Sequence, residues 1–85
     1  MAPSPRLIIG RVIAVDQERG FAFVELTRDA PAEAIVPNTE LSARTPELKG
    51  TALMQASRHR RGRTLGATIT SGKPSAGEEV VWLAP

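Results

Sequence analysis

The chain has 85 residues, which allows one small domain with a modest core and disfavours a catalytic cleft with walls of its own. It contains no cysteine and a single histidine, His59, so disulfides, thiolate metal sites and multi-histidine metal sites are excluded. The net charge is +2, but the arginines of segment 58–63 (RHRRGR) carry four positive charges, so the rest of the chain sums to −2.

The first part of the chain predicts a β-hairpin. Residues 1–6 are rich in proline, and we expect them to be flexible. Residues 7–15 (LIIGRVIAV) are mostly β-branched and predict a strand with a bend or bulge near Gly10. A polar turn that ends in glycine leads into residues 21–26 (FAFVEL), which predict the second strand.

The middle of the chain predicts shorter elements. A loop is expected over residues 27–32, and a third strand over residues 33–36, ended by Pro37. Residues 38–41 could form a single helical turn capped by a polar side chain. A connector then extends to Gly50.

The last part of the chain predicts a second hairpin. Residues 51–57 (TALMQAS) are ambiguous alone, but their flanks favour a strand that pairs with residues 64–70 (TLGATIT), with the basic segment at the tip. Residues 71–77 indicate a flexible linker, and residues 78–83 (EEVVWL) either a sixth strand or a docking segment. The whole pattern predicts an all-β protein, a small five-stranded antiparallel barrel over residues 7–70 with a linker and short apolar C-terminal tail over 71–85.

The first hairpin resembles that of the bacterial cold-shock domain. Residues 10–24 read GRVIAVDQERGFAFV, and in that family a Gly-x-Val strand leads through a polar turn into Lys-Gly-Phe-Gly-Phe-Ile. Residues 19–24 (RGFAFV) match the family's first ribonucleoprotein motif, and the order of the later elements also agrees over about residues 7–70. The resemblance implies an oligonucleotide-binding (OB) type of barrel that stacks aromatic side chains on the bases of single-stranded RNA or DNA.

Several positions depart from that family. Ala14 stands where the family usually has a tryptophan, and Ile13 where it has a basic residue. The second motif, usually Val-Phe-Val-His-Phe, aligns with residues 34–38 (AIVPN), which lack its aromatic residues and its histidine. Only Phe21 and Phe23 remain of the stacking residues.

Two interpretations of Phe21 and Phe23 stay open from the residues alone. Their i, i+2 spacing on a strand places both rings on one face, with Ala22 and Val24 on the other. The rings could fill the core of a chain with few aromatics, or they could lie outside and stack on bases, as the resemblance implies.

The basic segment is the strongest electrostatic feature of the sequence. Its four arginines are suited to bind phosphates, with Arg11 and Arg19 assisting; an acidic protein surface or a solubilising loop are the alternatives. These four are Arg58, Arg60, Arg61 and Arg63. His59 is expected to be a solvated loop residue, because the segment lacks other metal ligands.

Together these features predict a non-catalytic protein that binds single-stranded RNA or DNA, without a cofactor. The alternative is a small adaptor or inhibitor that docks on another protein. Trp82, in the apolar tail, could be the partner anchor of such an adaptor or could cover one end of the barrel. The apolar runs are too short to span a bilayer and the first residues do not resemble a secretion signal, so we expect a cytoplasmic protein of undetermined oligomeric state.

Overall fold

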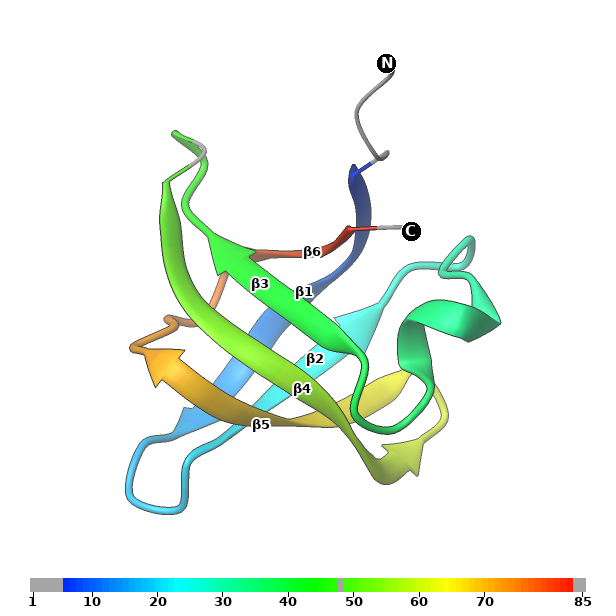
Figure 1. Cartoon of the computed structure of the whole chain (residues 1–85), viewed down its shortest axis with the longest axis horizontal. Helices are drawn as coiled ribbons and strands as arrows, with labels where there is room; N and C mark the ends of the chain where they lie inside the picture. The colour runs from blue at the N-terminus through cyan, green and yellow to red at the C-terminus, as the bar shows by residue number, and fades with distance from the viewer. Residues whose placement is uncertain (1–5, 48, 84–85) are drawn as a thin grey trace.

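Six β-strands and one short 3-10 helix make up the part of the chain that the computed structural model describes, residues 6–47 and 49–83 (Figure 1). The elements are β1 (Arg6–Asp16), β2 (Phe21–Leu26), η1 (Ala32–Ile35), β3 (Glu40–Arg44), β4 (Gly50–Arg61), β5 (Thr64–Gly72) and β6 (Glu79–Leu83). The expected flexibility of residues 1–6 concerns positions that lie outside the described residues, except Arg6, where β1 begins.

The described strands close into an antiparallel barrel in the order β1-β2-β5-β4-β3-β6. Each strand pairs with both neighbours, and β6 closes the ring between β3 and β1. Closure of the barrel pairs the backbone N–H and C=O groups that an open sheet would leave unpaired at its two edges. The predicted all-β antiparallel barrel is confirmed, although it has six strands and not five.

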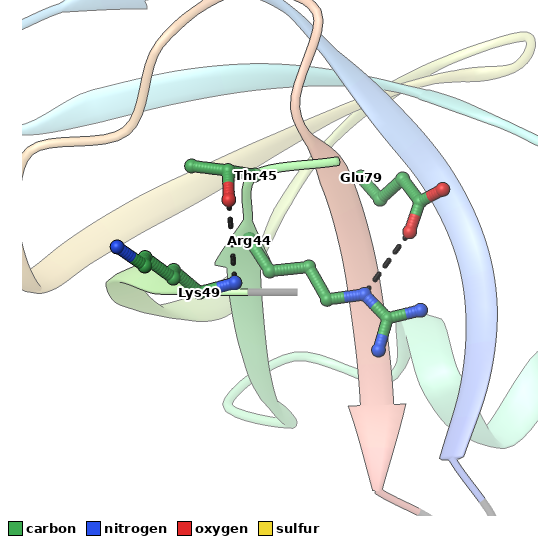
Figure 2. Close-up of polar contacts among 4 residues, drawn as sticks. All are labelled: Arg44, Thr45, Lys49 and Glu79. Carbon is green, nitrogen blue, oxygen red and sulfur yellow. Dashed lines mark hydrogen bonds and ion pairs between the residues drawn. The ribbon is translucent and has the colours of Figure 1, made fainter. Parts of the chain in front are cut away.

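The sixth strand is held by packing and by polar contacts. Val80 is fully buried, and Trp82 lies opposite Leu7 of β1 and Leu41 of β3. Figure 2 shows the ion pair that joins the guanidinium of Arg44 on β3 to the carboxylate of Glu79 on β6, with 3.0 Å between Nε and Oε2. Of the two possibilities for residues 78–83, the structure therefore shows the strand.

The connection from β5 to β6 is tied to the barrel through Glu78. The carboxylate of this buried residue accepts hydrogen bonds from the Thr51 hydroxyl at 2.8 Å and from the Ser75 backbone N–H at 2.7 Å. The backbone carbonyl of Glu78 accepts a further bond from the N–H of Val12. This connection therefore reaches β6 along a defined path.

The third strand predicted over residues 33–36 is wrong, because residues 32–35 form η1. Pro31 and Pro37 bracket this segment and cannot donate backbone hydrogen bonds to a sheet. Instead, the N–H of Ala34 bonds the carbonyl of Pro31, and the Ala34 side chain is buried in the core. The third strand, β3, lies at Glu40–Arg44, where the sequence predicted a helical turn and a connector.

The barrel interior contains many small side chains. Ala22, Ala67 and Ala56 lie side by side on β2, β5 and β4, and each is at most 2% exposed. The larger core residues occupy other levels of the barrel, and they are Ile9, Val12, Val24, Met54, Leu65 and Val80. A six-stranded barrel is narrower than the eight-stranded ones whose interiors are just filled by side chains, so alanines suit its interior.

The predicted irregularity near Gly10 is confirmed and has a steric cause. The register between β1 and β6 shifts between Ile8 and Gly10, and the backbone of β1 passes close to β2 at this point. A Cβ atom on Gly10 would lie 2.4 Å from the backbone oxygen of Glu25 and 2.8 Å from a methyl group of Val24. Only glycine permits this approach.

We therefore predict that Gly10→Ala lowers the free energy of unfolding by about 1–3 kcal/mol, the usual cost of overpacking. Gly50→Ala is the matched control, because a Cβ atom there meets nothing within 4 Å. Urea unfolding of both variants measures the difference. Equal stability of the two variants would contradict the close approach of β1 and β2.

Candidate functional site

The two phenylalanines lie on the outer face of β2. Phe23 is 40% exposed and Phe21 is half-buried, whereas Ala22 and Val24 point into the core and are fully buried. The predicted alternation of faces along this strand is confirmed. Neither ring belongs to the buried core of the barrel, so the core interpretation of the phenylalanines is wrong.

Small neighbours leave the ring of Phe23 uncovered. Its partner on β1 is Ala14, and its partner on β5 is Gly66, which has no side chain. Beside the rings, the surface forms a shallow and mostly apolar pocket that Phe21, Phe23, His59 and Gly66 line. This face of the sheet therefore offers flat aromatic surface to a ligand.

His59 reaches this pocket through a bulge in β4. Between the pairs Ala56–Ala67 and Arg60–Leu65, the three residues 57–59 of β4 lie opposite the single residue Gly66 of β5. The Ser57 hydroxyl donates a hydrogen bond to the Gly66 carbonyl and accepts one from the His59 N–H at 3.1 Å. These bonds fix the backbone that carries the imidazole.

The imidazole of His59 packs edge-to-face on Phe21, with 6.1 Å between the ring centroids and 74° between the ring planes. The prediction of a solvated loop residue is therefore wrong in part, because His59 is exposed but lies on a strand and against an aromatic ring. The sequence carries no signal for this contact, since it depends on the bulge. We call Phe21, Phe23 and His59 the aromatic surface.

Three of the predicted arginines lie near the end of β4, adjacent in the chain to His59 of the aromatic surface. Arg58, Arg60 and Arg61 are exposed and belong to the strand, so the hairpin tip consists only of Gly62 and Arg63. The Nε of Arg60 donates to the carbonyl of Gly62 at 3.2 Å. Within the described residues, no carboxylate lies within 4.0 Å of these three guanidinium groups.

The other predicted arginines occupy different surroundings. Arg19 lies in the β1–β2 turn, two residues before Phe21, and its Nε lies 3.8 Å from the carboxylate of Asp16. Arg11 lies further along β1, opposite Glu25 on β2, and it lines a second pocket together with Arg63. The structure therefore does not gather all the predicted arginines around the phenylalanines.

Trp82 is remote from the aromatic surface. It lies on β6, on the side of the barrel opposite β5, and its half-buried side chain packs against the core. This position fits a side chain that covers one end of the barrel. Its proposed role as a partner anchor remains a prediction.

Comparisons with known proteins found no matching family model, no matching curated protein and no matching solved structure. Over the residues that the structure describes, no three histidine, aspartate or glutamate side chains gather where they could hold a metal ion. The same residues contain no helix with the length and apolar character needed to cross a membrane.

The exposure of Phe23 predicts a small effect on stability. Phe23→Ala should lower the free energy of unfolding by well under the 2–5 kcal/mol or so that Leu65→Ala costs, because Leu65 is fully buried on the adjacent strand. Urea unfolding of the two variants provides the comparison. A larger loss for Phe23→Ala than for Leu65→Ala would place its ring in the core.

Proposed function

We propose that this chain is a cytoplasmic, non-catalytic protein that binds single-stranded RNA or DNA. The proposal rests on the exposed aromatic surface, whose His59 shares β4 with three arginines that have no carboxylate partner among the described residues. Aromatic faces stack on bases, and guanidinium groups bind phosphate oxygens through paired hydrogen bonds.

A single strand suits this surface better than a duplex. Phe21 and Phe23 are two positions apart on β2, about 7 Å along the strand. Bases can lie on the rings only when they are unstacked from their own neighbours, as in single strands and loops. The sheet also presents no helix that could enter a major groove among the described residues.

The arginines are expected to supply a large share of the affinity. Each stacked base contributes about 1–3 kcal/mol, and the chain has only two phenylalanines and one histidine to offer. Arg58, Arg60 and Arg61 belong to the same strand as His59, and we expect them to contact the phosphates of a nucleic acid that is stacked on the rings. Binding should therefore depend steeply on salt and weakly on base sequence.

The resemblance to the cold-shock domain gives this proposal a structural frame. Ala14, at the family's tryptophan position, lies opposite Phe23 on the outer surface. The first hairpin is thus arranged so that a larger residue at this position would extend the aromatic surface. We propose a divergent, OB-like relationship in which this extension is lost and β6 completes the barrel.

We predict that Phe23→Ala weakens binding of a fluorescent oligothymidylate or oligouridylate by about 1–3 kcal/mol, which is about 5- to 150-fold. The slope of log affinity against log salt should stay unchanged, because no phosphate contact is removed. Leu53→Ala is the matched control, since Leu53 is a 56% exposed apolar residue near the other end of β4.

The double variant Arg60→Gln/Arg61→Gln tests the electrostatic half of the proposal. It should reduce the slope of log affinity against log salt by about 0.7 for each lost phosphate contact, and it should weaken the binding of all oligonucleotide sequences to the same extent. Lys49→Gln/Lys73→Gln removes the same charge away from this hairpin and should have a much smaller effect. No binding by the parent protein at low salt would refute the proposal and favour the adaptor alternative.

A further inference from the structure

A second pocket lies on the outer face of the barrel, where β2 ends. Three arginines from three separate segments line it, namely Arg11 of β1, Arg28 of the turn after β2 and Arg63 of the turn between β4 and β5. Arg11 and Arg63 were among the predicted site residues, but no sequence pattern grouped them or indicated Arg28.

The backbone around this pocket is fixed by hydrogen bonds. The N–H of Leu26 donates to the carbonyl of Arg63 at 2.7 Å, and the N–H of Thr27 donates to the carbonyl of Ile9 at 2.8 Å. A further bond at 3.3 Å, from Ala30 N–H to the Thr27 carbonyl, closes the turn that carries Arg28. Three cationic side chains thus start from positions that are set before any ligand binds.

The charges of the pocket favour an anion. Two carboxylates also line it, Glu25 and Glu79, but Figure 2 shows Glu79 engaged by Arg44, 3.0 Å from its Nε. Over the described residues, none of the three pocket arginines has a carboxylate within 4.0 Å. The guanidinium groups therefore exceed the carboxylates that could neutralise them.

The pocket continues the aromatic surface along one strand. Phe21, Phe23 and Glu25 occupy every second position of β2, and all three side chains point outward. Because Glu25 lines the pocket, the pocket begins about 7 Å beyond Phe23 along the β-strand. A polynucleotide whose bases stack on the two rings would extend its backbone along β2 in this direction.

We propose that Arg11, Arg28 and Arg63 form a phosphate-binding pocket for the backbone of a single-stranded nucleic acid that continues past Phe23. This inference rests on the proposed function and adds the path of the bound nucleic acid, which follows β2 from the aromatic surface to the pocket. It also assigns Arg63 to a different group from the arginines of β4, which do not line this pocket.

If the nucleic acid follows this path, the contribution of the pocket to the binding affinity should depend on the length of the oligonucleotide. A dinucleotide covers the two rings alone, because the pocket begins only about 7 Å beyond Phe23, whereas a strand of about 12 nucleotides, within the site sizes of small barrels, also reaches the pocket. Arg11→Gln/Arg28→Gln should weaken binding of the longer oligothymidylate roughly tenfold per arginine and reduce its salt slope by about 1.4. Binding of the shorter one should change by less than about twofold.

Glu25→Gln provides a test in the opposite direction. Removing this carboxylate from the pocket should strengthen binding of the longer oligonucleotide by about two- to fivefold at low salt, since it abolishes the repulsion between the carboxylate and the bound phosphate. Glu47→Gln removes the same charge from the β3–β4 turn and should leave the affinity unchanged. A gain of affinity cannot result from a variant that fails to fold.

The outcomes separate the two proposals. If the parent protein binds neither oligonucleotide, the proposed function fails. If it binds both, but the Arg11→Gln/Arg28→Gln variant loses affinity equally for the two lengths, or for neither, the proposed path fails and the function stands. Circular dichroism and the thermal midpoint of each variant confirm that the barrel is intact.

Discussion

The narrow interior of a six-stranded barrel is the constraint from which the rest of the structure follows. At the level of the phenylalanines, Ala22, Ala67 and Ala56 fill the space between the walls, and each is almost completely buried. An aromatic ring in this row would overpack a core that has no room to expand. The strand therefore directs Phe21 and Phe23 outward, and the chain exposes its only two phenylalanines because its interior cannot hold them.

The same closure creates the irregular positions that shape the outer surface. Strands that curve into a small barrel need bulges, and these occur in β1 near Gly10 and in β4 after Ala56. The β4 bulge brings His59 to Phe21 because Gly66, opposite it, has no side chain; a Cβ atom there would lie 3.1 Å from that of His59. At Gly10 the close approach of β1 to β2 shapes the second pocket, which Gly10 also lines. Both candidate sites thus depend on a glycine beside a bulge.

Local patterns predicted the two hairpins, but not the elements whose form depends on distant partners. The alternation of FAFVEL fixed the faces of β2, and the flanks of TALMQAS identified β4 and β5, since these signals are contained in a few adjacent residues. Residues 33–36 read as a strand, yet the prolines on both sides and the burial of Ala34 against the core make a 3-10 turn. The contact of His59, the grouping of Arg11 with Arg63 and the pairing of β6 involve residues far apart in sequence, and no local pattern encodes them.

A reduced set of aromatics changes how a nucleic acid would be held. Two stacked bases supply about 2–6 kcal/mol together, and part of this offsets the loss of translational and rotational freedom on binding. Phosphate contacts must then provide the rest, and several contacts to one nucleic acid reinforce each other, because each contact already made raises the effective concentration for the next. Arg61 of β4 pairs with Thr64 of β5, which in turn pairs with Glu25 of β2. Arg61 and the second pocket therefore lie toward the same end of β2, beyond Phe23, with Arg11 on β1 to one side of β2 and Arg61 on β4 to the other. Two groups of arginines at the end of β2 beyond the rings therefore supply the phosphate contacts that two phenylalanines alone need to retain a single-stranded nucleic acid.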